Sequence, residues 1–385
     1  MEGIVTCTRC VLNTEDDPKI SFDQEGICNH CRNYKVVEKQ YAFTEEEREQ
    51  KLSELVHKMK ESGKGKQYDC ILGVSGGVDS TYLAYKVKQF GLRPLIVHFD
   101  NGWNSEMAVK NIENILNKLE FDLFTYVVDW EEFKDLQLSY IKASVIDWEI
   151  PTDHGFMAML FDQASKHNIE YILSGHNIVT EAILPKSMRW SKLDVANIKA
   201  IHKKYGNVKL KTFPLLGFFK YLYYLKVKKI KMVSPLNYME YNKKQVKEFI
   251  QKELGWRDYG GKHYESIFTR FYQGYVLPEK FKVDKRKAHL ATLINSGQIT
   301  REEALEELKE PPYDPQQLKI DKEYVIKKFD ITEIEFENYM NLPVRSHLDF
   351  DSYETGMYRD HEAFFKAIKP ITKLIKIVFG KSTRK

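Results

Sequence analysis

The residues best suited to chemistry form a short loop, Ser75-Gly-Gly-Val-Asp-Ser80, directly after an apolar run at 71–74. Adjacent glycines let the backbone turn tightly and point amide N–H groups inward, and a following helix would add its positive N-terminal end. This pattern is typical of a phosphate site, in which the hydroxyls of Ser75 and Ser80 donate to phosphate oxygens. Asp79 suits phosphate only through a divalent cation, so it indicates Mg²⁺. No Lys follows the glycines, unlike the Gly-x-x-x-x-Gly-Lys-Ser/Thr loop, and a plain Gly-Gly turn is the alternative.

Four of the five cysteines lie in two close pairs, Cys7 with Cys10 and Cys28 with Cys31. Each pair can form a tight turn that presents two thiolates, and together they supply the four sulfur ligands of a structural zinc. Reduced thiols without a metal are one alternative, and an iron–sulfur cluster is another. A segment this short could hardly bury a core unaided, so the metal would contribute folding energy. His30 lies inside the second pair, but four sulfurs already complete the site.

Alternating strands and helices are predicted around the loop. Apolar runs predict strands at 68–74, 93–99, 121–128 and 171–174, with helical stretches between them. This order predicts an α/β fold with a parallel sheet covered on both faces and ligands at the carboxyl ends of the strands. Strand signals fade beyond about residue 255, and helices are expected at 284–296 and 300–310, the second with a Thr300 and Glu303 capping box.

These signals divide the chain into four parts. They are a zinc-binding knuckle at 1–35, a helical connector at 36–66, an α/β domain at 67–255 and a mainly helical C-terminal region at 256–385. Residues 369–385 alternate basic and apolar positions and are expected to form either a surface helix or a packed or frayed terminus.

The overall composition excludes several classes of protein. The 385 residues are 43% hydrophobic and carry 59 Lys and Arg against 55 Asp and Glu, so a dedicated nucleic-acid binder is not expected. The first residues hold no secretory signal, and the longest apolar run, 213–225, is interrupted by Lys220 and too short to span a membrane. Five cysteines, an odd number, argue against a disulfide framework. We therefore expect a soluble protein of the reducing cytoplasm.

The loop resembles the SGGxDS loop of the PP-loop ATP pyrophosphatases, which include asparagine, GMP and NAD synthetases and several tRNA-thiolating enzymes. The resemblance implies a Rossmann-like, adenine nucleotide alpha hydrolase-like fold and cleavage of ATP between its α- and β-phosphates. It implies an ATP and pyrophosphate site made of Ser75, Gly76, Gly77, Val78, Asp79, Ser80, His98, Phe99, Asp100, Gly175 and His176, with Asn177 and Glu181 as substrate candidates. As alternatives, His98 would be a strand residue facing a helix and His176 a turn residue.

Later motifs narrow the resemblance, which then covers nearly the whole chain. The four-cysteine knuckle and the motifs Gly261-Lys-His-Tyr-Glu-Ser266, Thr269-Arg-Phe271, Asp284-Lys-Arg286 and Ser296-Gly-Gln-Ile-Thr-Arg301 are similar to N-acetyl sugar amidotransferases of surface-polysaccharide, O-antigen and flagellin-glycan biosynthesis. These enzymes convert the acetamido group of an N-acetylated sugar to an acetamidino group. The resemblance implies an O-adenylyl imidate intermediate, release of pyrophosphate and AMP, and ATP, Mg²⁺ and Zn²⁺ as cofactors.

The same resemblance supplies further site candidates. Lys262, His263 and Arg270 join Asp79 as catalytic candidates, and Glu265, Lys285 and Arg286 join the substrate candidates. Residues 262–270 are expected to bring Lys262, His263, Glu265 and Arg270 to a cleft from one helix. The alternative for each basic residue is a solvated surface position.

Ammonia for such a reaction usually comes from glutamine at a thiolate, and no cysteine here suits that role. Cys70 lies in a predicted buried strand, where thiols are inert, and the other four belong to the knuckle. The resemblance implies separate partners like the glutaminase and cyclase subunits of imidazole-glycerol-phosphate synthase. The basic and aromatic stretch 213–232 is expected to be an amphipathic helix with a wet basic side, and partner docking, lipid-linked glycan contact and RNA contact are the alternatives. Peripheral association with a membrane also stays open.

Two other functions share the loop. A tRNA-thiolating enzyme would need a reactive cysteine pair or a cluster-binding triad, and only Cys70 is outside the knuckle. A non-catalytic scaffold that binds zinc and nucleotide is the third hypothesis. The identity of the sugar, its nucleotide or lipid carrier and the oligomeric state do not follow from the sequence.

Overall fold

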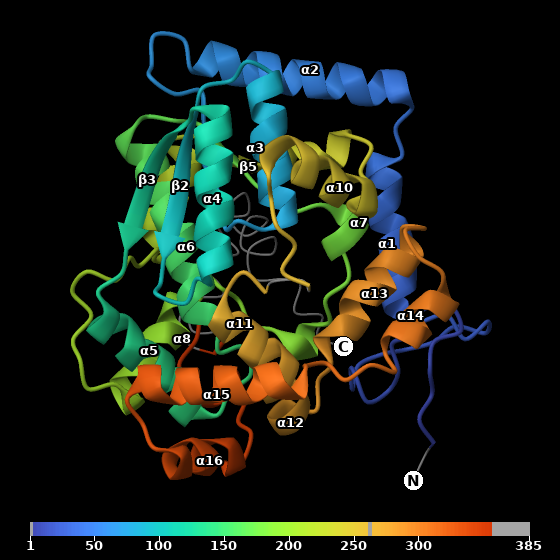
Figure 1. Cartoon of the computed structure of the whole chain (residues 1–385), viewed down its shortest axis with the longest axis vertical. Coiled ribbons are helices and arrows are strands. Elements are labelled where there is room, and N and C mark those ends of the chain that lie inside the picture. Colours follow the sequence, from blue (N-terminus) through green and yellow to red (C-terminus); the bar gives the residue numbers. More distant parts are fainter. Residues whose placement is uncertain (1–2, 261–263, 356–385) are drawn as a thin grey trace.

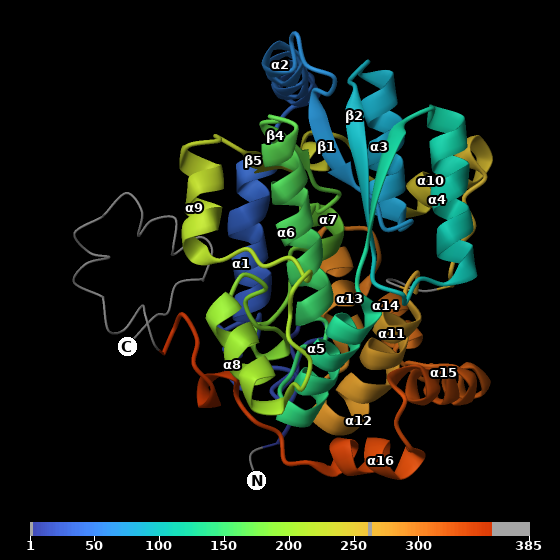
Figure 2. The same ribbon diagram turned by 90° about the vertical axis from the view of Figure 1, so that its left-hand side faces the viewer.

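A computed structural model describes residues 3–260 and 264–355, with a five-stranded parallel sheet at the centre (Figure 1, Figure 2). The strands are β1 Cys70–Gly73, β2 Pro94–Asp100, β3 Asp122–Val127, β4 Tyr171–Leu173 and β5 Lys231–Val233. Their order is β3-β2-β1-β4-β5, and each neighbouring pair is parallel. The chain moves from β1 to β2 on one side and returns to β4 on the other. The carboxyl ends of these strands therefore meet at a topological switch point, where α/β sheets bind ligands.

Helices cover both faces of the sheet because alternate strand residues point to opposite faces. Ile71 of β1 lies in one hydrophobic cluster, and Cys70 and Leu72 lie in the other. One face is covered by α3 Val78–Gln89, α4 Glu106–Leu119 and α10 Lys243–Leu254, and the other by α5 Trp130–Ala143, α6 Ile150–Lys166 and α9 Phe218–Lys226. The short α7 Ile178–Glu181 follows β4, and α8 Val195–Tyr205 packs against α5.

The N-terminal part leads into the sheet through two helices. α1 Asn29–Glu38 has Cys28 of the second cysteine pair as its N-cap, and the 3₁₀ turn Lys39–Tyr41 follows it. α2 Glu45–Ser62 begins at a capping box between Thr44 and Glu47. The predicted helical connector at 36–66 thus contains the end of α1 and the separate helix α2, because the Thr44 cap fixes a new helix start.

The C-terminal part is mainly helical in its described residues, as predicted. It contains α11 Ile267–Phe271, the π-helix Tyr272–Val276, α12 Leu277–Phe281, α13 Lys285–Asn295, α14 Arg301–Glu307, α15 Pro315–Phe329 and α16 Glu333–Asn341. Short 3₁₀ turns occur at Lys186–Met188, Pro235–Tyr238 and His347–Asp349. The predicted helices at 284–296 and 300–310 are confirmed as α13 and α14, and the capping box of Thr300 with Glu303 is present. α11 and α15 lie beyond the carboxyl ends of β2 and β3 (Figure 1).

The four predicted strands are confirmed within a few residues, but the fifth was missed. β5 lies inside the stretch 213–232, for which an amphipathic helix was the expectation. That expectation is wrong for much of the stretch, because α9 covers only Phe218–Lys226 and a left-handed Lys229, with φ of 57°, then turns the chain into β5. Three residues at a sheet edge, two of them exposed, carry too little apolar pattern to predict a strand.

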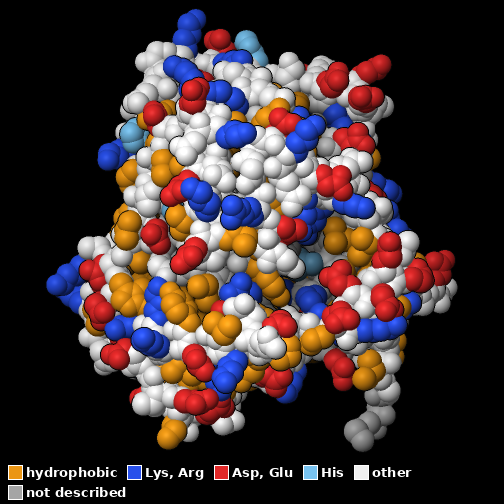
Figure 3. Space-filling model, in the orientation of Figure 1, with side chains coloured by type: hydrophobic (Ala, Val, Ile, Leu, Met, Phe, Trp, Pro, Cys, Tyr) orange, Lys and Arg blue, Asp and Glu red, His pale blue; other side chains and the backbone are white. Residues whose placement is uncertain are grey.

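No helix among the described residues is long and apolar enough to cross a membrane. Acidic and basic side chains are interspersed on the face shown in Figure 3. This agrees with the nearly balanced composition of 59 Lys and Arg residues and 55 Asp and Glu residues.

Candidate functional site

The predicted phosphate loop connects β1 to α3 at the carboxyl edge of the sheet. Gly76 has φ of +83°, in the left-handed region that favours glycine, and a Cβ there would meet the Tyr259 hydroxyl at 2.9 Å. Its carbonyl oxygen accepts hydrogen bonds from Trp256 Nε1 at 2.7 Å and from the Tyr259 hydroxyl at 3.0 Å. Two aromatic residues after α10 thus fix the turn from outside.

The loop then opens directly into the first turn of α3. Gly77 is the N-cap of α3 and leaves that helix end without a side-chain cap. Ser75 Oγ accepts from the Gly77 N–H at 3.2 Å, and Ser80 Oγ donates to the Gly77 carbonyl at 3.2 Å. Uncapped N–H groups and two hydroxyls at a helix N-terminus are the donors that a phosphate group needs.

Asp79 in this turn is held by side chains from two other elements. Its Oδ1 accepts from Asn177 Nδ2 at 3.2 Å and, at short range, from the Tyr241 hydroxyl. Burial raises the pKa of Tyr241 and the neighbouring Asp79 adds to it, so the phenol keeps its proton and donates. Asn177 is fully buried and its Oδ1 accepts from both the backbone N–H and the hydroxyl of Thr180. The Asp79 carboxylate therefore has a fixed position.

The third predicted loop, after β4, lies against the first. A Cβ at Gly175 would come within 3.1 Å of the Asp79 carbonyl carbon and of the Ser80 nitrogen, so a larger residue there would push the two loops apart by a few tenths of an ångström. His176 Nδ1 is 2.7 Å from Glu181 Oε2, and the backbone N–H of His176 donates to Ser174 Oγ. The structure therefore brings Gly175 and Asn177 against the phosphate loop, and His176 and Glu181 pair with each other in the same loop and the helix that follows it.

The end of β2 lies beside the loop, but its side chains already have partners. His98 Nδ1 is 3.0 Å from the Val74 carbonyl oxygen, and Nε2 is 3.0 Å from Asn104 Nδ2. These partners fit a neutral ring that donates at Nδ1 and accepts at Nε2. Phe99 stacks on Tyr126, and Asp100 Oδ1 accepts from the Gly102 N–H at 2.9 Å. A cavity of about 340 Å³ opens beside Asp100, lined also by Gly102, Val127, Val128, Trp130 and Lys328.

Glu265 reaches the loop from the C-terminal region, but not from a helix as predicted. Its carbonyl oxygen accepts from the Ser105 N–H at 2.9 Å, and Ile267 N–H donates to the Trp103 carbonyl at 2.9 Å. α11 begins only after Ser266, its N-cap, because this pairing keeps Ser266 extended and leaves Glu265 in the turn before it. The Glu265 carboxylate lies 3.3 Å from where a Cβ of Gly77 would be. Two carboxylates, Asp79 and Glu265, thus flank a loop built for anions.

The basic candidates have a different environment. Arg270 forms a two-point ion pair with buried Asp321, at 2.7 and 3.0 Å, which satisfies its guanidinium within the protein. Arg286 is bound to Asp284 and to the Glu310 carbonyl. The charge of Lys285 acts on the buried carboxylate of Asp147. Burial by itself would raise the pKa of Asp147, but the positive charges of Lys192 and, to a smaller extent, Lys285 bring that pKa below its ordinary value. Lys262 and His263 lie outside the described residues.

The four cysteines of the two pairs form one buried cluster. Their sulfurs lie within 4.8 Å of one another, with Cys10 to Cys28 at 3.8 Å and Cys7 to Cys31 at 4.0 Å. A tetrahedral Zn²⁺ with Zn–S bonds of about 2.3 Å separates its sulfurs by about 3.8 Å. Hydrogen bonds among the four sulfurs lower the pKa of Cys7 and of Cys28 and raise that of Cys10. The geometry fits a single ion better than a multi-iron cluster, whose ligands bind separate irons.

Groups around the cluster also favour thiolates. Asn295 Nδ2 donates to Cys31 Sγ at 3.1 Å, and the Cys28 N–H donates to Cys7 Sγ at 3.2 Å. Such donors to sulfur are typical of structural metal sites. His30 is 2.9 Å from Asp17 instead and is not part of the cluster, in agreement with the sequence prediction.

One region of the chain matches a known family. Residues 265–366 match the C-terminal domain of WbpG-like LPS biosynthesis proteins. The matched region begins at Glu265 and includes α11 to α16. This match covers part of the C-terminal region and does not include the phosphate loop.

Solved structures with a related arrangement are distant in sequence. An NMN synthetase from Francisella tularensis is 14% identical with a TM-score of 0.35, and the alignment covers 79% of this chain and 98% of that one. An NH3-dependent NAD synthetase from Campylobacter jejuni is 14% identical with a TM-score of 0.32, and the alignment covers 76% of this chain and 97% of that one. The U34-tRNA thiolase NcsA from Methanococcus maripaludis, solved with its [4Fe-4S] cluster, is 12% identical with a TM-score of 0.32. The alignment covers 80% of this chain and 89% of that one. No curated protein matches the chain.

Several residues of this site carried no sequence signal. Tyr241, Trp256 and Tyr259 contact the loop from more than 160 residues further along the chain. Each is an aromatic residue outside any motif, and its hydroxyl or indole N–H has a role only after the chain folds. In the sequence, Gly255 and Trp256 predict only that a helix ends there, and nothing in the pattern predicts that Trp256 contacts the loop.

Proposed function

We propose that the protein is an ATP-dependent amidotransferase that converts the acetamido group of an N-acetylated sugar to an acetamidino group. The observation that carries the proposal is the phosphate loop with Asp79 fixed at the start of α3 and Glu265 beside it. The region from Glu265 onward, similar to LPS biosynthesis proteins, supports a sugar substrate.

In the proposed reaction the amide oxygen of the sugar attacks the α-phosphate of ATP and pyrophosphate leaves. Ammonia then adds to the imidate carbon, and AMP leaves with the former amide oxygen while a proton is released. The loop amides and the hydroxyls of Ser75 and Ser80 would bind pyrophosphate as its charge develops. Asp79 and Glu265 would hold Mg²⁺, which supplies positive charge to the phosphates. Tyr241 and Asn177 would keep the Asp79 carboxylate aimed.

A zinc ion in the cysteine cluster is the second part of the proposal. It is supported by the sulfur separations of 3.8 and 4.0 Å and by the amide donors around Cys7 and Cys31. Its role would be structural, because all four sulfurs are buried and leave no open coordination position for a substrate.

The proposed ammonia source is a separate glutaminase, with which a cyclase-like subunit would associate in the cytoplasm. Cys70 is fully buried within β1, and burial raises the pKa of its thiol, so it does not serve as a nucleophile. The remaining four cysteines form the cluster.

The test is incubation of the purified chain with ATP, Mg²⁺, ammonium and a panel of N-acetylated sugars linked to nucleotide or lipid. The expected result is AMP, pyrophosphate and a product in which NH replaces one oxygen. Asp79→Asn should abolish AMP formation while keeping the melting temperature, and Asp349→Asn, an exposed carboxylate on the 3₁₀ turn at His347–Asp349, is the control. Absence of AMP with every sugar would overturn the proposal. AMP formed only with tRNA and a sulfur donor would favour thiolation, and nucleotide binding without AMP would favour a scaffold.

A further inference from the structure

α9 presents an apolar stripe to the outside of the molecule. Phe219, Tyr223 and Val227 follow one another at four-residue intervals and are 67%, 45% and 64% exposed. The opposite side of the helix packs inward through Phe218 and Tyr224, and α9 lies at the outer side of α6 in Figure 2. Large apolar side chains in a continuous exposed row mark an interaction surface.

Lysines surround this stripe at its C-terminal end. No acidic side chain of the described residues pairs with Lys226, Lys228 or Lys229, whereas Lys220 is paired with Asp162 and Lys231 lies 3.9 Å from Glu170. The uncompensated charge therefore lies beside Val227 and the last turn of α9. An apolar row with a lysine rim is the pattern of a helix that lies in a membrane interface.

The first turn of α9 is fixed by a contact with a distant part of the chain. Tyr353 packs on Phe218 with ring centroids 6.2 Å apart, and its hydroxyl accepts from the Phe218 N–H at 3.2 Å. This contact lies on the side of α9 that packs inward, so it leaves the apolar stripe exposed.

We propose that the α9 face, defined by Phe219, Tyr223, Val227, Lys226, Lys228 and Lys229, binds an anionic phospholipid surface. The three apolar side chains would enter the interface, and the lysines would pair with phosphate headgroups. The charge of the rim selects an anionic surface over a neutral one. The stripe belongs to a single convex helix without a lined groove, so it suits a lipid surface better than a protein partner.

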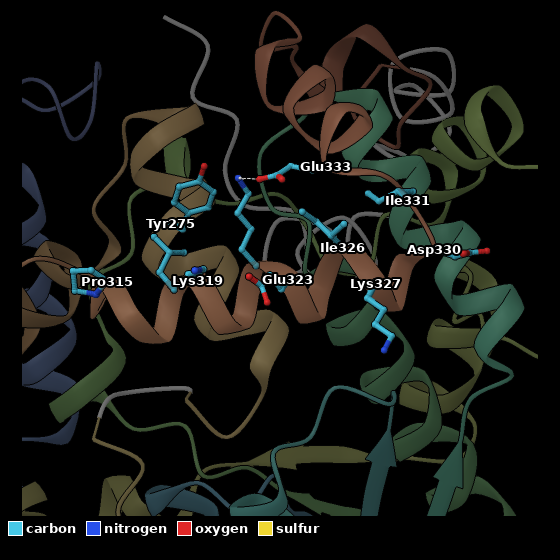
Figure 4. A pocket seen from close by; sticks show the side chains of 11 residues that line it. Tyr275, Pro315, Lys319, Glu323, Ile326, Lys327, Asp330, Ile331 and Glu333 are labelled. Atoms are coloured by element: carbon cyan, nitrogen blue, oxygen red, sulfur yellow. Dashed lines mark hydrogen bonds and ion pairs between the residues drawn. The ribbon is translucent and has the colours of Figure 1, made fainter.

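The cavity along α15 is a weaker candidate for a binding site than the α9 face. A cavity of about 790 Å³ runs along α15 and is lined by Tyr275, Leu318, Lys322, Ile326 and Glu333 among others. Lys322 pairs with Glu333 at 3.2 Å, and Figure 4 shows Glu333 at the cavity with this ion pair as a dashed line. The cavity does not indicate the chemistry of a ligand, whereas the lysine rim of the α9 face indicates an anionic one.

The test is co-sedimentation of the full-length protein with vesicles of phosphatidylcholine alone and of phosphatidylcholine with 30% phosphatidylglycerol. Binding is expected to the anionic vesicles only and should weaken as salt rises. Phe219→Ser with Tyr223→Ser should lower the affinity about tenfold or more. Replacing Lys226, Lys228 and Lys229 with Gln should lower it about a hundredfold, since each lysine contributes roughly a factor of five.

A matched control replaces three exposed lysines on other faces, Lys64, Lys118 and Lys252, with Gln. It changes the net charge equally and should retain binding. Equal loss in this control, or no binding of the wild type to anionic vesicles, overturns the proposal. So does a stripe variant that binds vesicles normally and either melts several degrees lower or changes from dimer to monomer. In the first case the stripe is covered by the chain itself, and in the second by another copy.

Discussion

At the scale of single residues, the site is defined by how firmly Asp79 is fixed. Tyr241 donates to Asp79 from the segment after β5, and Asn177 donates from the start of α7. Both donors are at most 4% exposed, so water does not compete for these bonds. A carboxylate held in this way is ready for a cation without reorganisation, which is the arrangement that lowers a barrier in phosphoryl chemistry.

Tyr241→Phe should therefore lower kcat/KM for ATP by about 10- to 100-fold, the effect of losing a hydrogen bond to a charged group. Because Asp79 would become mobile, the Mg²⁺ concentration for half-maximal rate should rise. Steady-state AMP formation at varied Mg²⁺ measures both. Tyr238→Phe is the control, since Tyr238 contributes only ring contacts with Tyr41 and Phe43. An unchanged Mg²⁺ dependence in Tyr241→Phe would contradict the role.

A second single residue makes stability depend on pH. The buried His154 ring is 2.6 Å from the Lys192 carbonyl and accepts from the Leu216 N–H at 3.1 Å, which fits a neutral ring with its proton on Nδ1. Burial lowers the pKa of His154 to about 4, below the ordinary 6.5. Its contribution is present above pH 6.5 and is lost as the pH falls through 6.5 towards 4.

Between pH 7.5 and pH 5, the wild type should lose about 2 kcal/mol more unfolding free energy than His154→Gln. Urea titrations of both proteins at the two pH values measure this difference. The variant will be less stable at pH 7.5, so only the change with pH tests the titration. Parallel losses in the two proteins would show that folding does not lower the pKa of His154.

At the scale of elements, the turn that follows α13 connects three parts of the molecule. Asn295 donates to Cys31 of the cysteine cluster, Ser296 Oγ donates to the Val179 carbonyl of α7, and Gln298 contacts both Tyr241 and Lys243. The two side chains that hold Asp79 are thus supported by the same turn that contacts the cluster. A loose cluster should loosen the phosphate loop as well.

Cys7→Ser should release the metal, lower the melting temperature by several degrees and also weaken ATP binding. Metal content by mass spectrometry, thermal unfolding and nucleotide titration give the three readouts. Cys70→Ala removes the remaining cysteine and should keep one metal ion per chain. Full metal content in Cys7→Ser would contradict the cluster as a metal site.

The sequence was sufficient for the elements whose pattern is local. The central strands are continuous apolar runs, the α14 cap is a four-residue motif, and the cysteines form two Cys-x-x-Cys pairs, so each could be predicted. β5 could not, because its short edge strand gains its identity from pairing with β4. Glu265 and Arg270 were expected on one helix, but pairing of 265–267 with 103–105 and the Asp321 ion pair separate them, and both depend on distant residues.

At the scale of the whole molecule, the reaction as proposed is incomplete without another protein. The described carboxyl edge gathers groups for ATP and metal, whereas every cysteine is either in the cluster or buried in β1. Nothing in these five thiols suits glutamine hydrolysis. Nitrogen delivery would then depend on a partner that releases ammonia close to the carboxyl edge.

The purified chain should form amidine product with ammonium salts and none with glutamine. The rate with ammonium should rise with pH up to about 9, because only the unprotonated form is a nucleophile. Product mass and glutamate release, measured side by side, check this prediction. Release of glutamate by the chain alone would contradict it, and Cys70→Ala would then show whether that thiol is responsible.

The turn from Asn295 to Gln298 also constrains how the chain can vary in length. One inserted residue there would move Gln298 away from Tyr241 if Asn295 stayed on the cluster, or break the Asn295 contact if Gln298 stayed in place. Among relatives of this protein, the spacing between Asn295 and Gln298 should therefore stay fixed.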